Sequence, residues 1–366
     1  MVFNSRRSFL QKLAAGSSVM LLPGCDKNPS AKSPAAPVTE DPTDCDFAPC
    51  GEYIKDHSFV FHDGWYHFFS ISGIKGYYHG YNGNEETVSW SISRDLVHWE
   101  MRGHVLHATQ RQGAFDQHEI WAPFCYKSDN RFYMFYTGVI HPFRPMEYRK
   151  LGHDHPWVID GHRETQGLAI SDDLTYWDKV SDFGNGLGIP GRDSFVTHDA
   201  EHSRWLLFST LGTHKLHVAE SRDLLNWSAI GECAEFPPLD PGISFGKTTD
   251  HFSAGEHRYY NSAESLTVMR HPLTGRWIML GNWQYIMSDD PLNFDGANAR
   301  EYDREYRGVQ VDMGFACEVL QHNGKWYRSG TMGLRDYWRL GFTEIEWVED
   351  GAFKVVKPSR IALEIS

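Results

Sequence analysis

The feature that most constrains the fold of this chain is a phrase that its sequence repeats. Three copies read Ser-x-Asp-Leu-x-x-Trp and begin at Ser93, Ser171 and Ser221. A weaker fourth copy begins at Ser288 and carries Phe294 in place of the Trp. Repetition of this kind indicates an array of similar structural units. We interpret each phrase as a turn capped by its Asp, followed by an aromatic ring that packs between units.

A hairpin pattern recurs through the same region. Each example joins an apolar strand, a tight turn and an aromatic strand, which is the signature of two antiparallel strands. The five patterns cover residues 59–72, 124–138, 195–210, 268–283 and 319–333. The 366 residues less the first 50 leave 316, or about 63 for each of five units, which suits four strands with their turns. We therefore predict an all-β fold, a five-bladed β-propeller over residues 51–366 with a single central active-site pocket.

Composition agrees with this fold and narrows the partners. Aromatic residues make up 14% of the chain and Gly occurs 33 times, a mixture typical of many short strands and turns. The net charge of -13 argues against nucleic acid as a partner. No apolar run is long enough for an ordinary membrane span.

The N-terminus resembles a bacterial export signal. Residues 1–25 carry Arg6-Arg7 before a short apolar stretch, as in twin-arginine signals, and end in a lipobox-like sequence before Cys25. Lipidation of Cys25 predicts a periplasmic or cell-surface lipoprotein, held to the membrane only by this N-terminal anchor. Simple cleavage and release, or a chance apolar N-terminus, are the alternatives. Residues 26–50, rich in Pro, Ala and Ser, are expected to be a flexible linker. Cys45 and Cys50 are near enough in sequence to bridge, or remain free thiols.

Three acidic residues occupy similar places in different units. Asp56, Asp193 and Glu264 precede the first strand of units one, three and four, each three or four residues before a Val. In a propeller these positions converge on one mouth of the central tunnel. Carboxylates that share a cavity raise one another's pKa values, an arrangement that is costly unless the protein uses it. Glycoside hydrolysis needs such a set, because one acid must be protonated while a second is ionised.

Longer segments around these acids resemble known enzymes. KDHSFVFHDGWY and HEIWAPFCYKSDNRFYMFYTG resemble the first and second blades of glycoside hydrolase family 43, and GRDSFV resembles the Arg-Asp-Pro motif of family 32. His57 and Ser194 stand where those motifs have Pro. Over about residues 51–350 the chain is therefore similar to the five-bladed propeller glycoside hydrolases of these two families.

The resemblance implies a role for each acid. Asp56 would be the water-activating base or the nucleophile, Asp193 would stabilise the transition state or tune the pKa of the acid, and Glu264 would be the general acid. Arg192 would bind a sugar hydroxyl or pair with Asp193. The structural alternatives are a strand-start cap at Asp56, a simple ion pair at Asp193 and an exposed hairpin acid at Glu264.

Other residues are candidates for contact with substrate. Trp121 would stack on a sugar ring or pack between blades, and His118, Glu318 and His251 would reach the axis. The insert at residues 141–167 is expected to overhang the pocket and favour short or terminal substrates. We expect no cofactor and no metal site. A Ca²⁺ beside His251 is the alternative, but no acidic calcium loop supports it.

Three functions fit these observations. The first is an exported hydrolase that cleaves a glycosidic bond of a furanoside or short oligosaccharide with paired carboxyl groups. The second is a glycoside phosphorylase, which would need an Arg and His cluster for phosphate. The third is a glycan-binding propeller without catalysis, for which the carboxyl groups need not converge.

Overall fold

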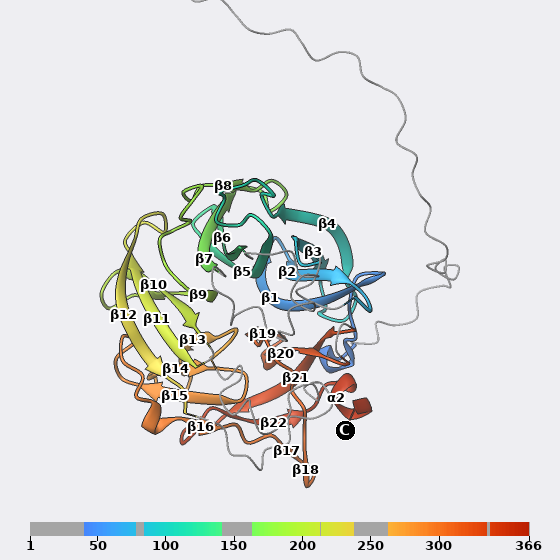
Figure 1. The fold of residues 1–366 in the computed structure, drawn as a ribbon. Helices are drawn as coiled ribbons and strands as arrows, with labels where there is room; N and C mark the ends of the chain where they lie inside the picture. The colour runs from blue at the N-terminus through green and yellow to red at the C-terminus, as the bar shows by residue number, and fades with distance from the viewer. Residues whose placement is uncertain are drawn as a thin grey trace, which may run out of the picture. The chain divides into compact units, whose positions relative to one another are not determined.

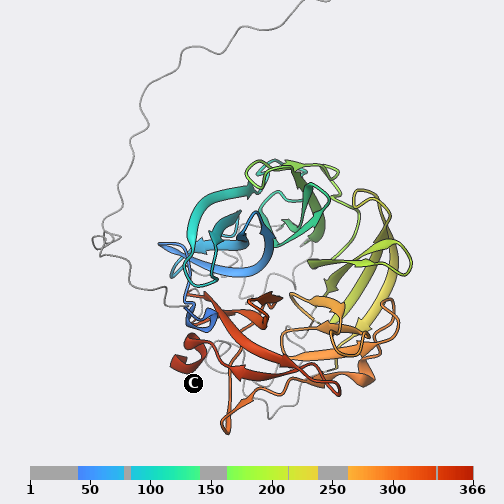
Figure 2. The ribbon, with the colours of Figure 1, turned by 180° about the vertical axis from the view of Figure 1, so that it is seen from behind.

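The described residues form a five-bladed β-propeller. The computed structural model describes residues 40–77, 84–140, 163–212, 214–237, 263–334 and 337–365. Within them, five four-stranded antiparallel sheets stand around a common centre, as the two opposite views in Figures 1 and 2 show. This confirms the fold predicted from the repeats. None of the helices in the described ranges is long and apolar enough to cross a membrane.

Each blade is an antiparallel meander whose first strand lies nearest the centre. Blade 1 consists of β1 (Glu52–His62), β2 (Trp65–Ile74), β3 (Thr87–Ser93) and β4 (Glu100–His107). Blade 2 consists of β5 (Glu119–Ser128), β6 (Arg131–Ile140), β7 (Arg163–Ser171) and β8 (Asp178–Lys179). Blade 3 consists of β9 (Arg192–Asp199), β10 (Arg204–Leu211), β11 (Lys215–Ser221) and β12 (Trp227–Glu235). Blade 4 consists of β13 (Thr267–Arg270), β14 (Trp277–Leu280), β15 (Gln284–Ser288) and β16 (Arg300–Glu301). Blade 5 consists of β19 (Val319–His322), β20 (Lys325–Met332), β21 (Arg339–Trp347) and β22 (Phe353–Lys357).

Short elements lie outside the blades. They are the 3-10 helices η1 (Pro42–Asp44) and η4 (Gly296–Asn298), the two-residue strands β17 (Glu305–Tyr306) and β18 (Val309–Gln310), and the helix α2 (Arg360–Ile365). The helix η1 and its neighbours pack on blade 5, where Phe47 and Leu340 exchange backbone hydrogen bonds and Arg339 pairs with Asp46 at 2.7 Å. The last part of the predicted 26–50 linker therefore belongs to the packed propeller. Cys45 is a buried free thiol, so the predicted alternative of a Cys45–Cys50 bridge is wrong.

The repeated phrase is the same turn in three blades. In blade 3, the Ser221 hydroxyl accepts hydrogen bonds from the backbone amides of Asp223 and Leu224, at 3.2 and 2.9 Å. The Asp223 carboxylate accepts from the amides of Leu225 and Asn226, at 2.9 and 2.7 Å. Equivalent bonds form in blades 1 and 2. The prediction that these Asp residues cap turns is confirmed.

In the phrases of blades 2, 3 and 4, the aromatic residue packs on the preceding blade. Trp177 of blade 2 lies 5.8 Å from Phe69 of blade 1, centroid to centroid. Trp227 of blade 3 lies 5.5 Å from Phe135 of blade 2, and both contacts are edge-to-face. Phe294 packs the same way on Phe208, at 6.3 Å. The rings therefore hold neighbouring blades together, as edge-to-face pairs do in protein cores.

Loss of one turn cap tests this interpretation. We expect Asp223→Ala to lower the free energy of unfolding by about 1 kcal/mol, because two backbone amides lose their acceptor. The Asn226 amide holds the pKa of Asp223 down to about 2. A carboxyl group with a lowered pKa in the folded state stabilises the protein above its unfolded pKa of about 4 and loses that effect as the pH falls. The difference in free energy of unfolding between the wild type and Asp223→Ala, measured with urea, should therefore shrink from pH 6 to pH 2.5. A difference that is constant with pH would contradict the capping role.

Candidate active site

Three of the innermost strands are broken by a β-bulge at the same point. The pairing of β1 with β2 shifts between Ile54 and His57, and that of β5 with β6 shifts between Trp121 and Phe124. The pairing of the β9–β10 ladder shifts in the same way. In four blades the residue at this point is left-handed, with φ between 43° and 58°, namely Ala122, Asp193, Ser265 and Ala316. A bulge bends the strand and re-aims nearby side chains, and bulges are frequent beside active sites.

The strand registers show which acids are equivalent. Asp56 lies two residues before Ser58, which pairs with Phe69 of β2. Asp193 lies two residues before Phe195, which pairs with Phe208 of β10. Phe69 and Phe208 each pack against the aromatic residue of the next blade's phrase, so they occupy equivalent positions in their blades. Asp56 and Asp193, which stand at the same offset from them, are therefore equivalent, as predicted.

Glu264 departs from that prediction by one residue. The left-handed residue of blade 4 is Ser265, and Glu264 precedes it. Counting back from the Val of each strand matches Glu264 with Asp193, but the residue of blade 4 that is equivalent to Asp193 is Ser265. Glu264 still joins the other acids, because its carboxylate contacts the Arg192 guanidinium that also lies beside Asp193.

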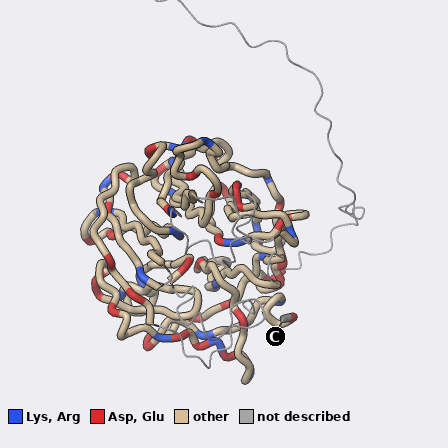
Figure 3. The backbone as a smooth tube through the Cα atoms, in the orientation of Figure 1, with Lys and Arg blue, Asp and Glu red and all other residues tan. Residues whose placement is uncertain are grey.

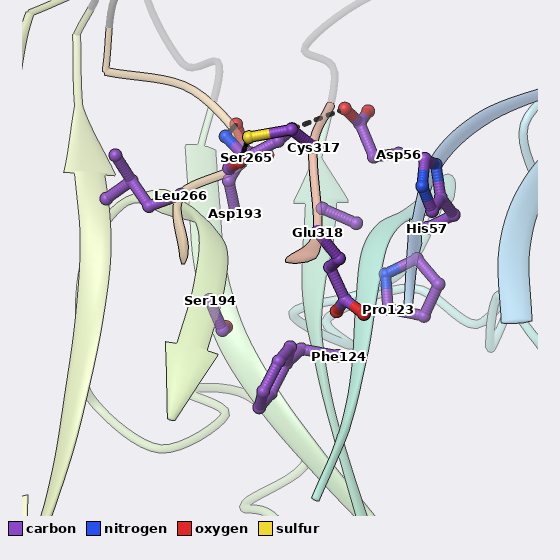
Figure 4. A pocket seen from close by; sticks show the side chains of 11 residues that line it. Asp56, His57, Pro123, Phe124, Asp193, Ser194, Ser265, Leu266, Cys317 and Glu318 are labelled. Atoms are coloured by element: carbon purple, nitrogen blue, oxygen red, sulfur yellow. Dashed lines mark hydrogen bonds between the residues drawn. The ribbon is translucent and has the colours of Figure 1, made fainter. Parts of the chain in front are cut away.

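Ser265 joins two of the acids directly. Its hydroxyl donates to Asp56 Oδ1 at 2.6 Å, and its backbone amide donates to Asp193 Oδ2 at 3.3 Å. Figure 4 shows Asp56, Ser265 and Asp193 at one end of a pocket. Each of the five blades contributes two or three residues to the lining of this pocket. Sequence reasoning missed Ser265, although its position directly after Glu264 was a usable signal.

Arg192 connects the remaining carboxylates. Its guanidinium lies 2.5 Å from Glu264 Oε1, 3.3 Å from Glu164 Oε2 and 3.7 Å from Asp193 Oδ2. Its side chain is only 7% exposed. The predicted Arg192–Asp193 pair is thus part of a larger network. Glu164, on the third strand of blade 2, carried no signal in the sequence.

Burial and mutual repulsion control the protonation of this cluster. Burial raises the pKa of Asp193 well above its usual range, the Asp56 charge adds to the rise, and Arg192 opposes it. Burial likewise raises the pKa of Glu264, where Arg192 opposes and Asp56 adds to the effect. Because the groups interact, they titrate as a set, and the cluster retains protons at a higher pH than isolated carboxyl groups do.

Known proteins share this architecture. A family model described as glycosyl hydrolases family 43 matches residues 59–164. A GH43_1 enzyme from Xanthomonas citri, solved with xylotriose, has a TM-score of 0.58 at 15% identity, with 87% of this chain and 96% of that chain covered. A GH32 β-fructofuranosidase from Bombyx mori has a TM-score of 0.56 at 15% identity, with coverages of 88% and 67%. Among curated proteins, no sequence matches.

This chain has the fold of the five-bladed propeller glycoside hydrolases. The predicted resemblance to families 43 and 32 is confirmed, and the family match together with the shared fold supports a glycosidase. The matched segment, residues 59–164, contains none of the three predicted catalytic acids. Their assignment therefore depends on the geometry of the site.

A buried ion pair of this glycosidase-like propeller stands beside the acids. Lys55 Nζ lies 3.2 Å from Glu85 Oε2 and 5.4 Å from the centre of the Trp121 ring. Burial opposes the charge of Lys55, but the charges of Glu85, Asp56 and Glu264 raise its pKa. Burial raises the pKa of Glu85 to about 7, and Lys55 opposes that rise. Lys55 therefore adds a positive charge close to Asp56 and Glu264, which sequence reasoning did not identify.

Of the predicted substrate-binding residues that the structure describes, Glu318 lines the pocket, whereas Trp121 and His118 are not among its lining residues. Trp121 is 4% exposed and packs with Ile71 and Val139, which is the inter-blade position that the sequence left open. His118 precedes β5, where its ring lies 3.0 Å from the Gln117 side-chain amide.

Several sequence predictions lie outside the described residues. They concern His251, Cys25, the export signal and residues 141–162 of the predicted insert. Within the described ranges, no group of three or more His, Cys, Asp or Glu side chains is arranged to hold a metal ion. Basic and acidic residues are interspersed along the chain in Figure 3, and neither kind forms a block at one side.

Proposed function

We propose that this protein is an exported glycoside hydrolase that cleaves a furanoside or short oligosaccharide. The observation that carries the proposal is the convergence of Asp56, Asp193 and Glu264 from three blades on Ser265 and Arg192. In this scheme two carboxyl groups and water perform all of the chemistry, so no metal or cofactor is needed. Lipidation of Cys25 would keep the enzyme at the membrane surface.

Glu264 is the proposed general acid. The raised pKa of its carboxyl group favours the protonated form over that of an isolated glutamate, and that proton passes to the glycosidic oxygen as the bond to the anomeric carbon breaks. Asp56, held as an acceptor by the Ser265 hydroxyl, either takes a proton from the attacking water or attacks the anomeric carbon itself. Asp193 is the proposed tuning residue, because it shares the Arg192 guanidinium with Glu264 and interacts electrostatically with Glu264.

A glycoside phosphorylase fits the site less well. Lys55 is already paired with Glu85, and Glu164, Asp193 and Glu264 already surround the guanidinium of Arg192. Three carboxyl groups around one guanidinium would repel an incoming phosphate. A glycan-binding propeller without catalysis remains an outcome of the test below.

A substrate panel tests the proposal. The purified protein would be assayed with aryl α-L-arabinofuranoside, β-D-xyloside, α-L- and β-D-galactoside, and with sucrose and short fructans. An Asp56→Asn, Glu264→Gln double variant serves as the blank. Turnover of one sugar that the blank lacks is expected, and it would identify the substrate class. Absence of turnover on every sugar, with glycans still bound on an array, would overturn the hydrolase and favour the glycan-binding propeller.

A further inference from the structure

The floor of the pocket carries an acid that the proposed reaction does not use. Glu318 lies two residues after Ala316, the left-handed residue of blade 5. Glu318 precedes β19 and lines the same pocket as Asp56 and Asp193. Figure 4 shows its carboxyl group directed away from Asp56 and Ser265 and toward Pro123 and Phe124.

The Glu318 carboxyl group is only half satisfied. Its Oε2 accepts a hydrogen bond from the backbone amide of Phe59 at 2.9 Å. Its Oε1 is buried and has no hydrogen-bond partner among the described residues. Buried polar atoms nearly always have a partner, so an unpaired oxygen beside a pocket marks a place where a polar ligand group or water binds.

The surroundings favour a neutral group as that partner. Burial raises the pKa of Glu318 to about 8, opposed by the Phe59 amide and the Ser58 hydroxyl, so the carboxyl group keeps its proton at pH 7. The titratable groups around it are Asp56 and His57 of β1, Cys125 of β5, Asp193 of β9 and the adjacent Cys317. Lys and Arg are absent from the described lining. An anionic sugar substituent would therefore be repelled, whereas a hydroxyl group can both donate and accept.

We propose that Glu318 is a specificity-determining residue whose carboxyl group binds one hydroxyl of the sugar held at the catalytic acids. This inference rests on the proposed function and extends it to neutral sugars. The pocket lining also includes the apolar residues Ala122, Phe124 and Leu266, so we expect the group that pairs with Glu318 to be a hydroxyl or hydroxymethyl set among apolar contacts. The hydroxyl that reaches deepest into the pocket would pair with Oε1.

Monodeoxy analogues of the sugar that the panel identifies provide the test. We expect one deoxy position to lower kcat/KM of the wild type by about 100-fold, because a site built for a hydroxyl rejects the analogue that lacks it. Glu318→Leu should lose most of that discrimination, with parent and analogue within about threefold of each other, and Glu318→Gln should retain it. Equal discrimination by the wild type and the Leu variant at every position would overturn the inference. Asp223→Ala serves as a variant that changes stability without touching the pocket.

A pH profile separates substrate contact from a structural role. Above about pH 8 the wild-type carboxyl group ionises and no longer donates, so KM should rise between pH 7 and 9. Glu318→Gln does not titrate, so its KM should stay flat over that range. A parallel rise in both proteins would contradict the role of Glu318.

Binding by calorimetry keeps the two proposals distinguishable. The probes are L-arabinose, D-xylose, D-galactose and D-fructose, which need no turnover. Binding to the wild type that Glu318→Leu weakens at least tenfold, in a protein that hydrolyses nothing, would reject the hydrolase and keep the Glu318 site. Hydrolysis with equal sugar binding in both proteins would keep the hydrolase and reject the site.

Discussion

Glu264→Gln is expected to lower kcat on substrates with poor leaving groups by about 10²- to 10⁴-fold, because the glutamine has no proton to give to the departing oxygen. On a dinitrophenyl glycoside the loss should be less than about tenfold, since that leaving group departs without protonation. The alkaline limb of the wild-type kcat/KM profile should also disappear, because the raised pKa of Glu264 sets it. Steady-state kinetics with a series of aryl leaving groups measures all three effects.

A matched control guards against indirect effects in that experiment. Asp199 is another buried carboxylate, and it lies at the other end of β9, paired with Arg204 at 3.0 Å. Asp199→Asn should lower the free energy of unfolding, but its kcat should depend on the leaving group as that of the wild type does. If Glu264→Gln loses activity equally on all leaving groups, Glu264 is not the general acid.

Arg192→Met is expected to lower the free energy of unfolding by about 3–5 kcal/mol, because it leaves buried carboxylates without their cation. The deficit should be larger at pH 8 than at pH 5. Without Arg192, the pKa values of Glu264 and Asp193 rise further above those of the unfolded chain. A carboxyl group with a raised folded-state pKa destabilises the protein as the pH rises above its unfolded value. Urea unfolding at the two pH values measures the difference.

The same variant should change the pH profile of any activity that remains. Because Arg192 lowers the pKa of Glu264, its removal should shift the alkaline limb to higher pH. If the Met variant does not fold, Arg192→Lys, which keeps a charge but loses the forked geometry, should shift the limb in the same direction by less. As a control, Arg131→Met breaks an exposed pair with Asp172 and should leave the free energy of unfolding nearly unchanged at both pH values. A deficit that is equal at pH 5 and pH 8 would show that Arg192 does not act through these carboxyl groups.

Local features of the fold could be predicted because they depend on residues close together in the chain. The Ser-x-Asp-Leu-x-x-Trp turns close through hydrogen bonds spanning two or three residues, as at Ser221 and Asp223. The hairpins have tight turns such as Asp63-Gly64, where β1 and β2 meet. Counting these patterns was enough to reach five blades and to select Asp56 and Asp193 as equivalent positions.

The site depended on contacts that have no trace in local sequence. Glu264 and Arg192 are 72 positions apart, and Asp56 and Ser265 are 209 positions apart. The bulges that re-aim these side chains arise from the pairing of neighbouring strands, so residue counting misplaced Glu264 by one position. Trp121 remained undecided for the same reason, since only the packing of blade 2 on its neighbour buries its ring.

By itself, the sequence determined the repeat, the turn chemistry and the acids to examine, because each of these is encoded within a few consecutive residues. Only the tertiary structure decided that Arg192 contacts three carboxyl groups, that Ser265 joins Asp56 to Asp193, and that Glu318 keeps an unpaired oxygen in the pocket. The physical reason is that charge, burial and hydrogen-bond satisfaction are properties of groups brought together across blades, and no single blade contains enough of them to set a protonation state.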